Sequence, residues 1–112
     1  MSMKQVAIVV VTALCLGATA FAQPASPFDG TLMPVKCQND NPATHARECA
    51  LECASTGLGL LTEAGEYLKF SAEGDKKGLE WLTATTRESD LKVRVTGTIK
   101  DGLLHVVSIT ER

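Results

Sequence analysis

The sequence of 112 residues predicts a mainly β fold with one substantial helix. Two patterns carry this prediction. Five short segments have the composition of strands and are separated by turn-forming residues, and a run of good helix formers follows the first of them. A shorter helical piece precedes the last two strands. This order of elements indicates a small five-stranded antiparallel OB-like barrel or half-open sheet, with the helix after the first strand.

The N-terminus has the pattern of a secretory signal peptide. Lys4 precedes an unbroken apolar run from Val6 to Leu16, and Ala20-Phe21-Ala22 offers small residues at the cleavage positions. The apolar run is shorter than the roughly 20 residues needed to cross a bilayer, so we expect no membrane segment in the mature form. Cleavage near Ala22 would release a secreted or periplasmic protein.

Cleavage would remove residues 1–22, including Cys15, and leave 90 residues. Residues 23–29 contain two prolines and are expected to be a flexible linker, and residues 30–110 are expected to form one OB-like domain. The remaining chain has ten basic and 13 acidic side chains, because only Lys4 is lost. A net negative charge and scattered aromatic residues argue against nucleic acid as a partner.

The first strand is expected from Thr31 to Lys36. Pro34 within it has no N–H and indicates an edge position or a bulge. Asn41 followed by Pro42 is a typical helix start, and Gly57 is a typical helix stop. A helix is therefore predicted over residues 43–56.

A hairpin and a short helical piece are expected next. Residues 58–62 and 66–71 are strand candidates, joined by a connection that contains Gly65. Residues 74–78 begin and end with glycine, so a break between elements is predicted there. One or two turns of helix are then predicted over residues 79–84.

The chain is expected to close with a second hairpin. Apolar and polar residues alternate from Leu91 to Thr96, which is the period-two pattern of a strand with one solvated face. The turn is predicted at Lys100-Asp101-Gly102, and the return strand runs from Leu103 to Ile109. Because both faces of the return strand are apolar, the pattern leaves the orientation of His105 open.

A cluster of metal-ligating and redox-active residues lies in the predicted exported part, comprising Cys37, His45, Cys49 and Cys53. An odd number of thiols allows a disulfide with a spare thiol, a metal site, or a disulfide-linked homodimer. On a continuous helix, His45, Cys49 and Cys53 would share one face, because each lies four residues from the next.

A structural disulfide is the first expectation, because exported thiols are usually oxidised. Cys49 and Cys53 would point in parallel along a helix, so Cys37 is the natural partner of either. A bridge from Cys37 to Cys53 or Cys49 would close a loop of roughly 13 to 17 residues, and loop-closure entropy then contributes about 3 kcal/mol. That contribution is a large share of the stability of a small domain.

A metal site is the alternative, with ligands drawn from Cys37, His45, Cys49 and Cys53. Thiolate and imidazole ligands suit zinc or copper, in a carrier or a sensor. One ion could take two ligands one helical turn apart, with Cys37 as a third, whereas all four ligands on one ion would need a bent helix. A third alternative is a peripheral thiol redox protein, although the chain has no Cys-x-x-Cys motif.

No catalytic residue is assigned from the sequence. No Ser-His-Asp order, phosphate loop or catalytic carboxylate pair stands out, and Glu48 and Glu52 beside Arg47 fit a solvated helix face. His105 is a lone histidine in a predicted strand. The first expectation is therefore a non-enzymatic binding or structural module of the cell envelope, without a cofactor, whose partner is an unidentified ligand or envelope protein.

Several residues between Gly30 and Ile109 support a resemblance: Gly30, Cys37, His45, Cys49, Cys53, Val93–Thr98 and His105–Ile109. On these positions the chain resembles small secreted bacterial OB-fold-like proteins, in which a first strand leads into a cysteine, a histidine and a Cys-x3-Cys helix. The resemblance implies the OB-like fold and no established activity. Those proteins often have an acidic residue shortly before the first cysteine, whereas Pro34 and Val35 occupy that stretch here.

Overall fold

The computed structural model describes residues 24–112, so the predicted signal peptide lies outside the described residues. The strands, α-helices and 3-10 helices follow one another along this part of the chain. They are β2 (Ser26–Pro34), η3 (Val35–Cys37), α2 (Arg47–Cys53), η4 (Ala54–Thr56), β3 (Leu58–Thr62), β4 (Tyr67–Lys69), α3 (Ala72–Ala84), β5 (Lys92–Lys100) and β6 (Leu103–Glu111).

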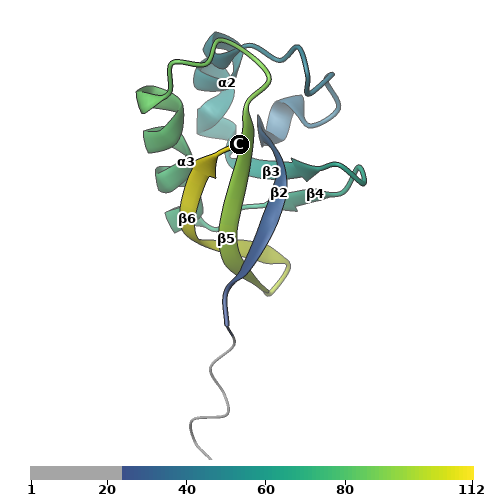
Figure 1. The fold of residues 1–112 in the computed structure, drawn as a ribbon, viewed down its shortest axis with the longest axis vertical. Helices are drawn as coiled ribbons and strands as arrows, with labels where there is room; N and C mark the ends of the chain where they lie inside the picture. Colours follow the sequence, from purple (N-terminus) through teal and green to yellow (C-terminus); the bar gives the residue numbers. More distant parts are fainter. Residues whose placement is uncertain (1–23) are drawn as a thin grey trace, which may run out of the picture.

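The five strands form one antiparallel sheet in the order β4-β3-β2-β5-β6. Figure 1 shows β2, β5 and β6 running along the long axis of the molecule, whereas β3 and β4 cross it. The two edges of the sheet meet at one point, where the N–H of Ser71 donates to the carbonyl oxygen of Leu104 at 3.1 Å. The predicted mainly β fold is thus confirmed in its half-open form, with α2 after the first strand.

The strand β2 begins earlier than the sequence predicts. Residues 26–31 pair with β5, and residues 30–34 pair with β3. Residues 26–29 therefore belong to the sheet, and the prediction that they are linker is wrong. Gly30 stands where the two ladders overlap, and a Cβ atom there would clash with the carbonyl oxygen of Leu61. The close approach of β3 thus requires glycine at this position.

The helix α2 begins later than predicted. Asn41 starts a turn instead of a helix, since its Oδ1 accepts the N–H of Ala43 at 3.0 Å. The N–H of Arg47 then donates to the carbonyl oxygen of Glu88 at 2.8 Å, and the helix starts at Arg47. Pairing with a distant segment thus outweighs the local helix-start signal. As a result, His45 precedes α2 and does not lie on it.

The helix α3 is longer than predicted and includes residues 74–78, so the predicted break there is wrong. Gly74 and Gly78 lie one turn apart on the face that contacts the sheet. A Cβ atom at Gly74 would lie 2.8 Å from Phe70 Cβ, and one at Gly78 would lie 2.8 Å from a methyl carbon of Leu58. Close packing on the sheet offsets the roughly 1 kcal/mol that each glycine costs in helix propensity.

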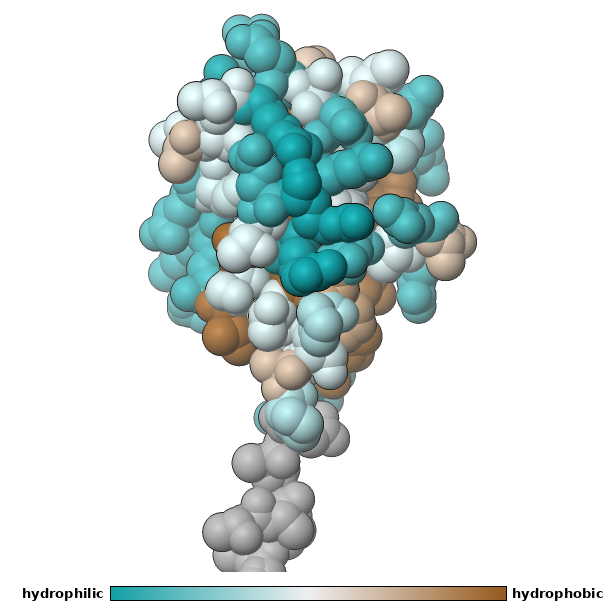
Figure 2. Space-filling view, in the orientation of Figure 1, coloured by the Kyte–Doolittle hydropathy of each residue, from teal (hydrophilic) through white to brown (hydrophobic). Residues whose placement is uncertain are grey.

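The apolar core lies between the curved sheet and the two helices. Its buried members are Leu32, Ala50, Leu58, Leu60, Phe70, Leu82, Leu91, Val93, Val95, Leu104 and Val106. Figure 2 shows that hydrophilic residues cover most of the visible face, while hydrophobic ones gather toward its lower end. Within residues 24–112, no helix has the length and apolar character needed to cross a membrane.

Asp75 connects α3 to β3. Its Oδ1 accepts the N–H of the buried Leu58 at 2.9 Å. Asp75→Ala should lower the free energy of unfolding by about 1 to 3 kcal/mol, because it leaves this N–H unpaired. Asp75→Asn keeps an acceptor oxygen and should lose less. Urea denaturation of both variants checks this, and equal losses would argue against a role for the hydrogen bond.

Asp29 and Arg94 form an ion pair across β2 and β5, with nitrogen–oxygen distances of 2.7 and 3.0 Å. The hydrogen bond from Arg94 lowers the pKa of Asp29. A carboxyl whose pKa is lowered on folding stabilises the fold above its unfolded pKa of roughly 3.9, and this contribution disappears as the pH falls through the folded pKa.

Asp29→Asn should therefore be less stable than the parent protein at pH 7, and the difference should vanish in strong acid. Thermal unfolding of both proteins at several pH values measures the difference directly. Because the pair is on the surface, added salt should also reduce the difference at pH 7. A difference that stays constant from neutral to strongly acidic pH would show that the ion pair is not its source.

Candidate metal site

The segment between β2 and β3 carries the candidate site. It leaves the sheet after Pro34 and returns at Leu58, and its two ends are joined where the N–H of Val35 donates to the carbonyl oxygen of Gly57 at 2.9 Å. Between these points the chain forms η3, a loop, α2 and η4. Cys37, His45, Cys49 and Cys53 all lie on this excursion from the sheet, residues 35–57.

Three side chains of the excursion converge: Cys37, Asp40 and His45. Their ligand atoms all lie within 4.8 Å of one another. Cys37 is the last residue of η3, and its carbonyl oxygen accepts the N–H of Asp40 at 2.9 Å, which closes a turn. The loop between η3 and α2 then brings His45 to the same place. The site is thus built by a loop and not by one face of a helix.

The imidazole of His45 is buried without a hydrogen-bond partner. Only 5% of its side chain is exposed, and neither ring nitrogen has a partner among the described residues. Nε2 lies 3.8 Å from Asp40 Oδ2, which is too long for a hydrogen bond. A buried polar atom left unpaired costs about 1 to 3 kcal/mol. Neither nitrogen is engaged by another described residue, so one of them can bind an ion that enters the cluster.

The thiol of Cys37 is also buried, and its neighbours include the Cys53 thiol and the Asp40 carboxylate. Burial, followed by these two neighbours, raises the pKa of Cys37 to about 11. The thiol is therefore protonated at neutral pH and would lose its proton only to a strong partner such as a metal ion. The thiol of Cys53, the last residue of α2, neighbours that of Cys37 but is outside the group of three, so Cys53 is the nearest candidate for a fourth donor.

The four predicted site residues are thus only partly brought together. Cys49 is exposed on α2 and takes no part in the group that converges on Cys37. His45, Cys49 and Cys53 do not share a helix face, because His45 precedes α2. The three cysteines within residues 24–112 are free thiols in this structure, and the predicted bridge from Cys37 to Cys53 or Cys49 stays a prediction.

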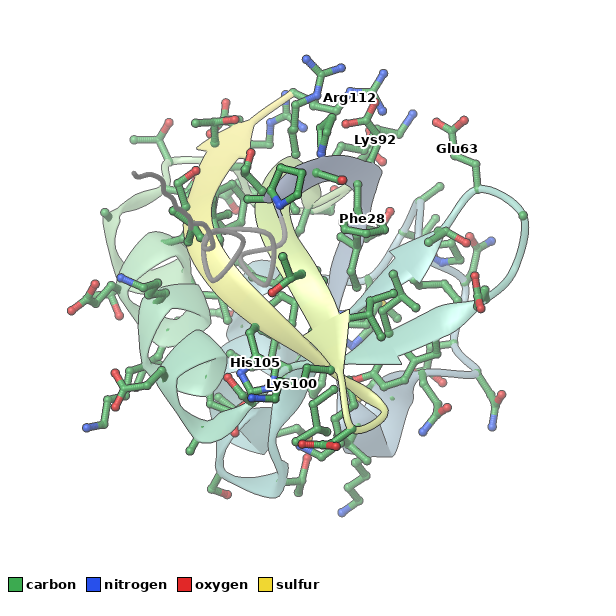
Figure 3. All side chains as sticks on the ribbon, turned by 90° about the horizontal axis from the view of Figure 1, so that it is seen from below. Phe28, Glu63, Lys92, Lys100, His105 and Arg112 are labelled. Carbon is green, nitrogen blue, oxygen red and sulfur yellow. The ribbon has the colours of Figure 1, made fainter. Side chains whose placement is uncertain are left out.

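His105 lies far along the chain from this cluster and has another environment. It is partly exposed on β6, and its Nε2 lies 3.3 Å from the carbonyl oxygen of Lys100. Figure 3 shows His105 and Lys100 close together at one end of the hairpin formed by β5 and β6. His105 is therefore not part of the candidate site.

The sequence pattern does not identify Asp40. The proteins that the chain resembles often have an acidic residue before the first cysteine, which is missing here, whereas the structure supplies a carboxylate three residues after Cys37. Turn-forming residues follow Cys37, and a turn brings residues i and i+3 within 7 Å. The three-residue spacing of Cys37 and Asp40 within a turn was therefore the sequence signal for this third ligand.

The donor set defines what the site can do chemically. A thiol, an imidazole and a carboxylate are ligands that zinc accepts together, whereas calcium and magnesium prefer oxygen donors alone. Asp40 is 60% exposed, so the cluster is open on one side. No protein-family model, curated protein or solved structure matches this chain.

Proposed function

We propose that this chain is an exported zinc-binding protein that holds the ion through Cys37, Asp40 and His45, with Cys53 as the fourth ligand. One observation carries the proposal. A thiol, a carboxylate and a buried imidazole with two unpartnered nitrogens lie within 4.8 Å of one another. Such buried polar groups are costly unless they are paired or bound to a metal. Export rests on the signal-peptide pattern of residues 1–22.

Zinc is favoured over copper by the mixed character of the ligands. Cuprous copper prefers soft thiolate and thioether sulfur, whereas zinc also accepts carboxylate oxygen and imidazole nitrogen. The exposed carboxylate of Asp40 gives an ion access to the buried Cys37 and His45. An open side suits a carrier or sensor that loads and releases its metal, and it requires no catalytic step.

The proposal is tested by zinc titration of the reduced protein, prepared without chelator, in competition with a chromogenic chelator. Cys37→Ser and His45→Ala should each weaken zinc binding by about 100-fold or more, because even residues that only support metal ligands are worth 10- to 100-fold. Cys49→Ser and His105→Ala are matched controls that should bind as the parent does. Unchanged affinity in Cys37→Ser would refute the proposed site.

A second candidate is the non-enzymatic OB-like binding or structural module of the cell envelope, stapled by a disulfide. The nearness of the Cys53 thiol to Cys37 favours it, with Cys53 as the partner. Oxidised protein would then be lighter by about 2 Da and would expose one alkylatable thiol before reduction and three after it. Three alkylatable thiols in unreduced protein from the periplasm would exclude the bridge. The same experiment detects a homodimer linked through the exposed Cys49.

A thiol redox protein is the least supported of the three functions. Reactive thiols have a lowered pKa, whereas the pKa of Cys37 is raised. The exposed Cys49 lies in the first turn of α2, but the next cysteine, Cys53, follows it at four residues and not at the spacing of a Cys-x-x-Cys motif. The redox function therefore has less support than the other two.

A further inference from the structure

The second half of β6 has backbone groups that no strand pairs with. β6 is the last strand of the sheet. The N–H of Arg112 donates to the carbonyl oxygen of Lys92 at 3.0 Å, and Ile109 lies opposite Val95. Because hydrogen bonds alternate along an antiparallel pair, the N–H and C=O groups of Ile109 and Glu111 point away from β5. An edge of this kind is a template for another extended chain.

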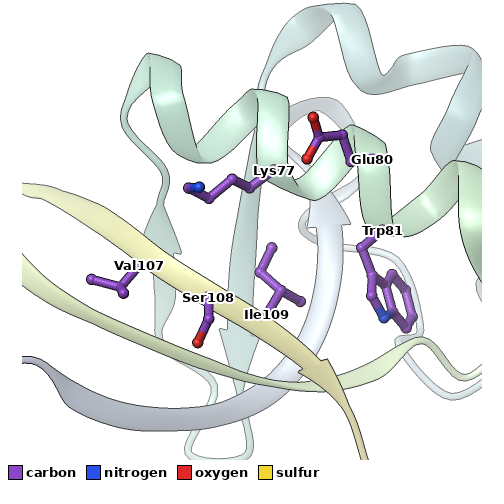
Figure 4. Close-up of a pocket in the computed structure, with 6 residues that line it drawn as sticks. All are labelled: Lys77, Glu80, Trp81, Val107, Ser108 and Ile109. Carbon is purple, nitrogen blue, oxygen red and sulfur yellow. The ribbon is translucent and has the colours of Figure 1, made fainter.

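A groove of about 320 Å³ lies between this edge and α3. Figure 4 shows Ile109 pointing from β6 toward α3, where the Trp81 ring lies beside it. Both side chains are partly buried and pack against the core, so they form an apolar floor. Lys77 and Glu80 of α3 both line the groove, and Figure 4 shows the Glu80 carboxylate turned away from β6. The groove thus offers an apolar surface and a cation side by side.

Lys77 is available to an anionic partner. It takes part in no ion pair within residues 24–112, whereas the neighbouring Lys76 lies 3.9 Å from Glu73. Lys77 and Trp81 are one turn apart, which is about 6 Å along a helix. Two residues of an extended chain span about 6.7 Å. The spacing of two side chains on one face of an added strand therefore matches that of Lys77 and Trp81.

We propose that β6 and α3 bind an extended segment of a partner protein by strand addition. The segment carries an acidic residue two positions from a bulky apolar residue. The carboxylate pairs with Lys77, the apolar side chain packs on Trp81 and Ile109, and the backbone bonds to the free edge of β6. This site uses none of the residues of the metal cluster, so it stands independently of the zinc proposal.

The test uses two end-capped synthetic peptides, Thr-Val-Glu-Thr-Phe-Val-Thr and its reversed sequence, because the segment could run in either direction. Trp81 is the single tryptophan of the chain, so its fluorescence reports binding directly. We expect a saturable change with at least one peptide. Lys77→Glu should weaken binding about fivefold to tenfold, and a peptide with lysine in place of glutamate should recover it. Lys76→Glu is the matched control and should bind as the parent does.

A second arm tests the backbone pairing without changing the protein. N-methylation of the peptide amides that face β6 removes the donors of strand addition, and binding should be lost. Equal binding of the methylated peptide would overturn the proposal. Failure of both peptides to change the fluorescence at about 1 mM, which corresponds to only about 4 kcal/mol of affinity, would also overturn it. A dimer in sedimentation that Ile109→Pro abolishes would instead assign the edge to a second copy of the chain.

Discussion

Zinc at a thousandfold excess over its dissociation constant should raise the free energy of unfolding by about 4 kcal/mol. The gain is expected because the ligands of Cys37, Asp40 and His45 are held within 4.8 Å of one another by the fold. An unfolded chain has no such site, so binding energy adds to folding energy. Urea denaturation of the reduced protein with zinc, and again after chelation, measures this effect.

His45→Ala is the decisive variant in the zinc stability experiment. It removes the buried imidazole and should abolish most of the zinc-dependent gain, whereas Cys49→Ser should keep the gain because Cys49 is exposed and outside the cluster. Magnesium should give no stabilisation, because it prefers sites made of oxygen donors. A gain of equal size in His45→Ala would show that the ion binds elsewhere.

Phe70→Ala should lower the free energy of unfolding by about 3 to 5 kcal/mol, the usual cost of deleting a buried aromatic ring. Phe70 is 1% exposed and lies where the edges of the sheet meet, since the next residue bonds to Leu104. Its ring also lies under α3, because Cβ atoms at Gly74 and Gly78 would approach ring atoms at 3.2 and 3.4 Å. One substitution thus removes packing from both the sheet and the helix.

Leu79→Ala provides the comparison for Phe70→Ala. Leu79 is in the same helix that covers Phe70, but it is 44% exposed, so its truncation should cost well under half as much. Equilibrium urea denaturation gives both values. A loss below about 1 kcal/mol for Phe70→Ala would mean that the ring is not a central part of the core.

The sheet could be predicted because its signals are local. The alternation from Leu91 to Thr96 and the turn at Asp101-Gly102 depend only on neighbouring residues, and β5 and β6 are found there. The N-terminal half of α3 could not be predicted, because Gly74 and Gly78 disfavour a helix locally. They are tolerated through their contact with Phe70 and Leu58, which only the folded chain provides.

The candidate site was predictable in its chemistry and not in its geometry. Cys37 and His45 stand out as metal-ligand types in any sequence, and both belong to the cluster. Their arrangement depends on where α2 starts, and that is fixed by the bond between Arg47 and Glu88, which are far apart in sequence. No local pattern reports such a bond, so the helix-face geometry predicted for His45 is wrong.

The hydrogen bond between Val35 and Gly57 marks the boundary between the sheet and the segment that carries the candidate site. It closes the base of the excursion, and the pairing of Pro34 with Leu58 continues the sheet directly below it. Loop-closure entropy grows only slowly with loop length, so the sheet tolerates changes in what lies above that base. Residues 38–44, which include Asp40, contribute no side chain to the core cluster, so substitutions, insertions or new donors there leave the packing of the strands unchanged. The scaffold and the chemistry it carries are therefore free to evolve at different rates.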